Sequence, residues 1–322
     1  MAVEVSVDVL DERDQRLVAA LQYDGRLTAH RAGEVLGLSP RTVQRRWRAL
    51  MDGTVRVVAL PPRPAAIGAL LLRIRVLRGK TDAIAAALAA REDVPFIDLS
   101  ASGDEISAVA WTAPGTRDRL VFRQLPSARA VTDVTAATVL HAFREAADWR
   151  HDVLTAAERQ ALAPPYAAGG TPPDPPDDLD RAVLAALRAD ARAPAAAVAA
   201  RTGAPESTVR RRIARLAASG ALRTQVVVDV RRLGLAIDAN VMMRVPPARL
   251  DAVGRALAAH PAVHGAFATT GTANLHAAVW VRGLPHLYRF VSEELGALGV
   301  DSAETVIVGQ AVKRPGAPAV IG

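Results

Sequence analysis

The stretch GLSPRTVQRRWRALM, residues 37–51, has the pattern of a tight turn followed by a capped, amphipathic helix. Ser39 can accept hydrogen bonds from the first free backbone amides of a helix, and Pro40 suits the next position because its missing N–H is not needed there. Three apolar side chains recur at the spacing that places them on one buried stripe: Val43, Trp47 and Leu50. These residues therefore predict an amphipathic helix that begins directly after Ser39.

The other side of this helix carries concentrated positive charge. Residues 37–51 contain four arginines and no acidic residue, so the solvent-facing side is a basic strip rather than a balanced surface. Double-stranded DNA is the expected partner, because Arg pairs with phosphates and with guanine edges and Gln44 can read adenine. The residues predicted to contact DNA here are Ser39, Arg41, Thr42, Gln44, Arg45, Arg46 and Arg48.

Two further helices are predicted before this one. Residues 11–22 carry apolar side chains at helical spacing, behind acidic residues that favour the positive end of a helix. Thr28 is a capping residue for a second helix that ends at Leu36, and Gly37 makes the tight turn into the basic helix. The order helix, helix, tight turn, helix is a helix-turn-helix motif. The valine-rich run 55–60 then predicts a strand.

The motif occurs twice in the chain. A shift of 166 residues lays residues 180–216 on residues 14–50 with identical residues at many positions, which indicates an internal duplication. In the second copy Pro205 takes the place of the capping Ser39 and Glu206 introduces an acid, so a weaker or differently tuned DNA contact is expected from it. The residues predicted to contact DNA in this copy are Ser207, Thr208, Arg210, Arg211 and Arg212.

The duplication continues after each motif. Strand, helix, strand, strand, helix and strand signals follow one another twice, in residues 69–140 and 239–312. We therefore predict an α+β fold with two winged helix-turn-helix domains and two βαββαβ (ferredoxin-like) α/β sandwich domains, arranged as an internal duplication. Helices would cover one face of each sheet, and the other face would be buried against the second copy, which makes the chain an intramolecular pseudo-dimer. The aromatic residues expected in the cores are Trp111, Phe122, Trp280 and Phe290.

The domain boundaries follow from these patterns. The predicted segments are helix-turn-helix domains at 8–62 and 177–231, βαββαβ domains at 66–148 and 235–314, and a linker at 149–176. Within the linker, Thr155 and Glu158 are spaced as a capping box for a short helix. The proline-rich run 164–176 is expected to be semi-rigid, with one hinge at its paired glycines.

Composition and charge narrow the class of protein. The 322 residues are half apolar, contain no cysteine and carry a formal charge of +7. Neither a disulfide framework nor a thiolate metal site is therefore expected. The first residues lack the pattern of a signal peptide, and no apolar run approaches the roughly 20 residues that span a bilayer. A cytoplasmic, nucleoid-associated protein without a membrane partner is expected.

No motif for catalysis or cofactor binding is visible. The sequence contains no Gly-rich phosphate loop, zinc signature or nucleophile elbow, so we predict no enzyme, no catalytic residues and no metal or cofactor site. His260 and His264 are four positions apart, a spacing that would suit a metal on one helix face. Pro261 lies between them and would end the preceding helix, so a turn is the better interpretation.

The combination of a helix-turn-helix with a βαββαβ domain resembles the Lrp/AsnC family of bacterial and archaeal transcription regulators. The residues that carry the resemblance are Leu10-Asp11, Arg16-Leu17, Gly37-Leu38-Ser39-Pro40, Thr42-Val43, Arg45-Arg46, His260-Pro261-Ala262-Val263 and Thr270-Gly271. Members of this family usually carry one such unit, dimerise through the βαββαβ (RAM-type) domain and often assemble further. The resemblance implies a DNA-binding transcription regulator that contains two units in one chain and can form a further homo-oligomer.

The resemblance also implies an effector site for an amino acid or another small molecule. In the family this site lies near the turn after the second strand, and that turn often contains an acidic residue. The corresponding residues here are Ser102, Gly103, Asp104, Thr270, Gly271, Thr272 and Asn274. The second copy has Asn274 in place of the acidic residue, and the turn of the first copy reads as one residue shorter.

Two alternatives share this architecture. Siroheme decarboxylases of haem biosynthesis resemble Lrp/AsnC proteins, and under that interpretation His264, His276 and Arg289 would be the candidate active-site residues. The other alternative is a sensor that binds an effector but no DNA and regulates through a partner protein. The basic helices discriminate between these possibilities, because neither a decarboxylase nor such a sensor needs unopposed arginines on them.

Overall fold

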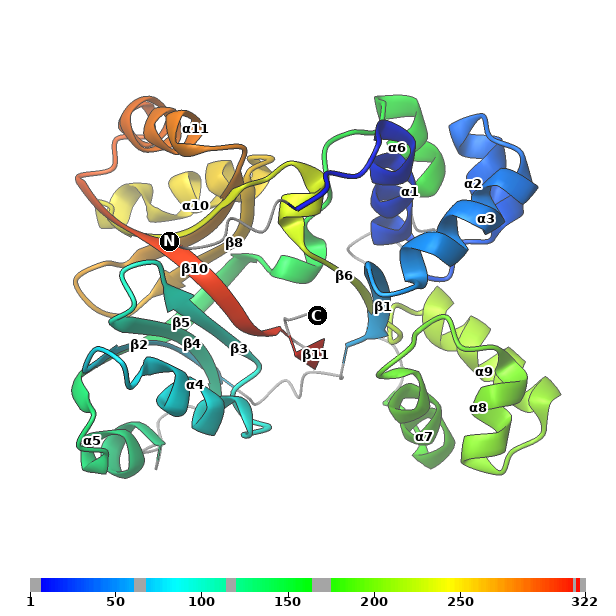
Figure 1. Cartoon of the computed structure of the whole chain (residues 1–322), viewed down its shortest axis with the longest axis horizontal. Coiled ribbons are helices and arrows are strands. Elements are labelled where there is room, and N and C mark those ends of the chain that lie inside the picture. The colour runs from blue at the N-terminus through cyan, green and yellow to red at the C-terminus, as the bar shows by residue number, and fades with distance from the viewer. Residues whose placement is uncertain (1–6, 61–67, 114–119, 164–174, 315–316, 319–322) are drawn as a thin grey trace. The chain divides into compact units, whose positions relative to one another are not determined.

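The computed structural model describes residues 7–60, 68–113, 120–163, 175–314 and 317–318 (Figure 1). The chain forms two compact units, and each unit takes one segment from each copy of the repeat. Met1–Arg63 and Arg150–Leu233 form the helix-turn-helix unit, and Pro64–Trp149 and Gly234–Val320 form the α/β unit. No helix in the described ranges is both long enough and apolar enough to cross a membrane.

The first copy of the helix-turn-helix has the predicted helices. They are α1 (Glu12–Tyr23), α2 (Ala29–Leu36) and α3 (Pro40–Met51). The side chains of Asp11, Thr28 and Ser39 each accept a hydrogen bond from a backbone N–H in the first turn of the helix that follows. Gly37 ends α2 in the left-handed conformation, at φ 69°, which glycine adopts without a steric penalty.

The second copy repeats this arrangement, but only the first of its three helices has a side-chain cap. It consists of α7 (Asp178–Leu187), α8 (Ala195–Thr202) and α9 (Glu206–Ala218). Pro205 precedes α9 and supplies no side-chain cap, as the sequence predicted. The predicted short helix is α6 (Ala156–Leu162), with the capping box of Thr155 and Glu158 in place. It packs against α1 and α2, and Glu158 forms an ion pair with Arg16. The predicted hinge lies in residues 164–174, outside the described ranges.

The two helix-turn-helix copies share one small sheet. Strand β1 (Val55–Ala59) pairs antiparallel with β6 (Thr224–Val228), with Val57 opposite Val226. The expectation of two separate winged domains is therefore corrected, because each motif contributes one strand and the partner strand comes from the other copy. Reciprocal arginines strengthen this connection: Arg26 donates to the carbonyls of Ala191 and Ala193, and Arg192 donates to those of Gly25 and Leu27.

The α/β unit contains the βαββαβ pattern twice. The first copy runs β2 (Gly68–Val76), α4 (Thr81–Ala89), β3 (Phe96–Ser100), β4 (Glu105–Thr112), a helical stretch η1–α5 (Leu120–Ser127) and β5 (Val131–Arg144). The second runs β7 (Ile237–Arg244), α10 (Leu250–Ala259), β8 (Val263–Thr269), β9 (Leu275–Val281), a helical stretch α11–η5–α12 (Leu284–Ala297) and β10 (Ser302–Arg314). Short 3-10 turns at Ala146–Asp148, Val230–Leu233 and Pro247–Arg249 and the short strand β11 (Ala317–Pro318) complete the described elements.

The strands of both copies form one closed sheet. The order is β10-β3-β4-β2-β5-β8-β9-β7, and β7 pairs with β10 to close the ring. The expectation of two separate sandwich domains packed face to face is thus corrected, because the sheets also join edge to edge by backbone hydrogen bonds. Helices α4, α10 and α11 lie on the outside of this closed sheet (Figure 1).

Two equivalent seams join the copies. The end of β5 crosses to β8, with Val139 opposite Thr269, and the end of β10 crosses to β3, with Val308 opposite Ser100. The two seams are equivalent, because Val139 corresponds to Val308 and Ser100 to Thr269, in each case 169 residues apart. The crossing strands β5 and β10 each also carry a basic side chain that reaches the C-terminal end of a helix in the other copy. Arg144 donates to Ala258 and His260, and Lys313 to Ala89 and Arg91.

Two apolar cores lie between the outer face of the closed sheet and its helices. One is centred on Ile74, Ile97 and Ile106 of the first copy, and the other on Leu257, Leu275 and Phe290 of the second. Phe290 is 1% exposed, so its predicted core position is confirmed. Trp280 packs against Trp149 with its ring edge-on, whereas the side chain of Phe122 lies outside the described parts. Trp111 lies half-buried on β4.

Replacing Gly254 by Ala is expected to destabilise the protein, although Gly→Ala inside a helix normally stabilises by up to about 1 kcal/mol. A Cβ at Gly254 of α10 would lie 2.2 Å from Cε2 of Phe143, a side chain that β5 of the first copy packs into the second core. Such overpacking typically costs about 1–3 kcal/mol. Urea unfolding measures the change.

Gly296 supplies the control for this substitution, since a Cβ there meets nothing within 4 Å. Gly296→Ala is expected to leave the free energy of unfolding unchanged or slightly raised. Truncation of Phe143 to Leu should relieve part of the cost of Gly254→Ala. If Gly254→Ala were as stable as the wild type, Phe143 could not pack against Gly254 of α10 as described.

Candidate nucleic-acid interface and effector loops

The outward side of α3 presents unpaired arginines. Val43, Trp47 and Leu50 are buried, and Ser39, Arg41, Gln44, Arg45 and Arg48 are exposed. Among the residues that the structure describes, no hydrogen bond or ion pair engages the side chains of Arg41, Arg45 or Arg48. Thr42 is half-buried, with its hydroxyl 2.8 Å from that of Ser39. An exposed helix with free guanidinium groups can bind a polyanion without first breaking internal ion pairs.

Arg46 has a different environment from its neighbours on α3. Its Nη1 lies 2.8 Å from a carboxylate oxygen of Asp11 and 2.8 Å from one of Asp14, and the side chain is half-buried. The hydrogen bonds that Arg46 donates, first the one to Asp14 and then the one to Asp11, raise the pKa of Arg46. The charge of Arg46 therefore links α3 to α1. Unlike the exposed arginines of α3, this predicted DNA contact is already paired inside the protein.

The outward side of α9 has fewer free charges. Arg212 repeats the role of Arg46, with its Nη1 2.5 Å from Asp177 and 3.2 Å from Asp180. Arg210 pairs with Glu206 on the same helix, and Arg215 pairs with Asp180. The remaining predicted contacts are Ser207 and Arg211, which are exposed, and Thr208, which is half-buried. The two helices therefore offer unequal surfaces.

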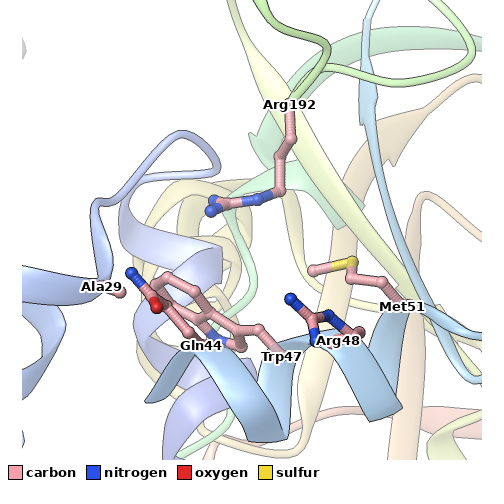
Figure 2. A pocket seen from close by; sticks show the side chains of 6 residues that line it. All are labelled: Ala29, Gln44, Trp47, Arg48, Met51 and Arg192. Carbon is pink, nitrogen blue, oxygen red and sulfur yellow. The ribbon is translucent and has the colours of Figure 1, made fainter. Parts of the chain in front are cut away.

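A pocket of about 420 Å³ lies beside α3. It is lined by Ala29, Gln44, Trp47, Arg48, Met51 and Arg192. Figure 2 shows Gln44, Trp47, Arg48 and Met51 extending from α3 and Arg192 approaching from the second copy. The guanidinium carbon of Arg192 lies 4.6 Å from the centre of the Trp47 ring, a cation–π distance. Sequence reasoning missed Arg192, because only the pairing of the two copies brings it to this helix.

The effector loops are the two turns that contain residues 102–104 and 270–274. Most of the polar side chains in these residues already form hydrogen bonds within the protein. In the second copy the Asn274 amide exchanges two hydrogen bonds, at 2.9 and 2.8 Å, with the backbone of Val245, and the hydroxyl of Thr270 accepts one from the N–H of Thr138. In the first copy the Ser102 hydroxyl donates to Asp104, which lowers the pKa of that carboxyl. Gly103, Gly271 and Thr272 are exposed.

The two effector loops have the same length, which corrects the expectation of a shorter first loop. The strand pairs that border them are Leu99 with Ile106 and Ala268 with Leu275, and both pairs enclose the same number of residues. Glu105 of the first copy therefore occupies the position of Asn274. The Glu105 side chain is buried and pairs with Arg73, which also reaches Glu304 on β10.

A cluster of buried charges lies on the inner face of the closed sheet. Arg314 of β10 lies 2.5 Å from Asp98 of β3 and 3.3 Å from Asp238 of β7. The ring of His264 stacks on Trp280 at 3.7 Å, and its Nε2 is 3.5 Å from Asp238. Sequence reasoning missed the three charged members. An aspartate within an otherwise apolar strand, as in FIDLS, was the available signal.

The residues of the decarboxylase alternative do not meet. His264 and His276 point from β8 and β9 to the inner face of the sheet, opposite the apolar residues that face the helices. Arg289 is exposed on α11, which covers the outer face. Burial lowers the pKa of His276 to about 4, so this ring is neutral near pH 7. His260, at 2.7 Å from Glu294, diverges from His264, as expected for a turn.

Residues 10–51 and 177–217 match the AsnC-type helix-turn-helix domain, and residues 238–318 match the Lrp/AsnC ligand binding domain. A helix-turn-helix transcriptional regulator of Pyrococcus horikoshii is 33% identical over 134 residues, which are 41% of this chain and 85% of the relative. The chain belongs to the Lrp/AsnC family. A Pyrococcus abyssi member is 34% identical, again over 41% of this chain and 85% of its own. These Lrp/AsnC relatives are about half as long, as the internal duplication requires.

The regulatory protein AsnC of Haemophilus influenzae is 27% identical over 41% of this chain and 89% of its own. A solved structure of the siroheme decarboxylase NirDL covers 94% of this chain and 92% of its own, with a TM-score of 0.59 and 13% identity. At that identity the likeness shows a shared fold.

Proposed function

We propose that this chain is a sequence-specific DNA-binding transcription regulator that presents two recognition helices, α3 and α9, from one polypeptide. The exposed and unpaired Arg41, Arg45 and Arg48 on α3 are the observation that carries the proposal. Arginine forks supply both phosphate contacts and bidentate contacts to guanine, and Gln44 adds a group that suits adenine. Membership of the Lrp/AsnC family supports the same function.

The pairing of β1 with β6 makes the two recognition helices parts of one unit. One chain can then bind both half-sites of an operator, at centres one helical turn or about 34 Å apart if the two copies obey a two-fold axis. Because α9 has Arg210 in an ion pair and Ser207 at the position of Arg41, the half-sites should be imperfect repeats and the α3 half should contribute more affinity.

A mobility-shift titration with DNA from upstream of the gene, at several salt concentrations, tests this function. If the complex uses about six phosphates, a log–log plot of affinity against salt should have a slope near −5. The mass of the complex, from light scattering, should correspond to one chain per pair of half-sites. Affinity that is absent for every upstream fragment, or that is independent of salt, would contradict the proposal.

An amino acid or a similar small effector is proposed to bind at the loops around Gly103 and Gly271. The match of residues 238–318 to the Lrp/AsnC ligand binding domain supports this site in the second copy. Asn274 and Thr270 hold the loop in shape through backbone contacts, so the exposed Thr272 and the backbone of Gly271 are the groups open to a ligand. Repeating the mobility shift with each common amino acid added tests for a change in DNA affinity.

A siroheme decarboxylase activity is the second candidate. The likeness to NirDL over nearly the full length of both chains favours it. The separation of Arg289 from His264 and His276 by the sheet weighs against the residues considered for it. Anaerobic incubation with siroheme, followed by mass spectrometry of the tetrapyrrole, distinguishes the two functions, and loss of carboxyl groups would establish the enzyme.

A further inference from the structure

We propose that the pocket beside α3 is a binding site for a phosphate group, held jointly by Arg48 of the first copy and Arg192 of the second. The two guanidinium groups line one pocket of about 420 Å³, together with Gln44, Trp47 and Met51 and without any acidic side chain. Because the phosphate is expected to come from the DNA backbone, the inference rests on the proposed function and deepens it.

The charges around the pocket favour an anion. In the described part of the chain, neither Arg48 nor Arg192 forms an ion pair, and the hydrogen bonds of Arg192 go to the neutral carbonyls of Gly25 and Leu27. Burial, followed by the positive charge of Arg26, lowers the pKa of Arg192, and the carboxylates of Asp24 and Asp190 act in the opposite direction. A phosphate would compensate that repulsion and accept charge-assisted hydrogen bonds from both guanidinium groups.

The position of Arg192 is preset. One face of its guanidinium lies on the Trp47 ring, and two of its nitrogens are held by carbonyls of the first copy at 2.7 and 3.1 Å (Figure 2). A side chain held in this way loses little conformational freedom when it binds a ligand. The carbonyl end of α3 near Met51 opposes an anion, so the two guanidinium charges together make the site favourable.

The corresponding position in the second copy lacks this chemistry. A shift of 166 residues places Arg26 at Arg192, but Ile213 replaces Trp47 and Ala214 replaces Arg48. Arg210 takes the place of Gln44, but it is paired with Glu206, so the aromatic platform and an unpaired second guanidinium are present on one side only. Arg26, which makes the same kind of carbonyl contacts, is therefore a matched control for Arg192.

The test compares the salt dependence of DNA binding for Arg48→Met, Arg192→Met and the double variant. Loss of one phosphate contact should reduce the log–log slope by about 0.9. If both arginines hold the same phosphate, each single variant and the double variant should lose about the same amount, roughly one unit of slope, instead of adding up. Arg26→Met should leave the slope of the wild type unchanged.

The Arg48 side chain makes no hydrogen bond or ion pair with any described residue, so Arg48→Met is expected to fold even if Arg192→Met is unstable. A parallel arm measures the thermal melt of wild type and Arg48→Met with inorganic phosphate and no DNA. Stabilisation of the wild type alone would support the site and assign it to a free anion. Wild-type slopes in both single variants, together with no effect of phosphate, would overturn the inference. Failure of the wild type to bind DNA would instead remove the proposed function.

Discussion

Replacing Arg41 and Arg45 together by alanine is expected to weaken operator binding by about 30-fold or more, without a change in the thermal melt. Both side chains are exposed on α3, and no described residue pairs with them, so their removal breaks no internal contact. Each arginine contact to a base or phosphate is typically worth about 1–3 kcal/mol. A mobility shift at fixed salt measures the loss.

Two controls separate recognition from folding. Ser207→Ala with Arg211→Ala changes the equivalent positions of α9 and should weaken binding less, because this pair removes one guanidinium instead of two and Arg210 of that helix is in an ion pair. Arg46→Ala should instead lower the melting temperature, since it leaves the carboxylates of Asp11 and Asp14 without their partner. An unchanged shift in the Arg41 and Arg45 double variant would remove these residues from the interface.

Replacing Asp98 by Asn is expected to raise the stability of the protein above pH 7 and to remove the contribution of Asp98 to its dependence on pH. The inner cluster holds two carboxylates, Asp98 and Asp238, and one guanidinium, Arg314, so one carboxylate favours its neutral form. Burial raises the pKa of Asp98 to about 7, against the attraction of Arg314. Burial also lowers the pKa of His264, so this ring does not supply the missing positive charge at neutral pH.

The sign of the effect follows from proton linkage. The folded state holds the Asp98 proton up to about pH 7, whereas the unfolded chain releases it near 3.8. The contribution of Asp98 to the free energy of unfolding therefore falls as pH rises through this window, by at most about 1.4 kcal/mol per pH unit. The lowered pKa of Asp238 acts below pH 4, and the lowered pKa values of His264 and His276 act in the opposite direction below about pH 6.5, in the wild type and the variant alike. Urea unfolding of the wild type and of Asp98→Asn at pH 5, 6.5 and 8 measures the free energy of unfolding of each.

The exposed Asp133 on β5 provides the control for this measurement. Asp133→Asn should keep the pH dependence of the wild type, because that carboxyl is in water in both states. If Asp98→Asn retained the same slope between pH 5 and pH 8, the cluster would not hold a proton on Asp98.

Local signals determined the elements and the repeat. Ser39, Thr28 and Gly37 mark helix ends through contacts within a few residues, and the structure has each of them as predicted. The apolar stripe of α3 and its exposed arginines follow from helical geometry, which is also local. The duplication and the family resemblance needed only the order of residues.

The tertiary structure decided which charges are free and how the copies join. Arg45 and Arg46 are neighbours in sequence, yet only Arg46 meets Asp11 and Asp14, because α1 packs on one side of α3. The pocket with Arg192 and the cluster of Asp98 with Arg314 exist because strands and loops more than a hundred residues apart become neighbours. The periodicity of a strand reports which face is buried, but it does not report which edge pairs with another strand, so the closed sheet and everything held by it depend on the folded chain.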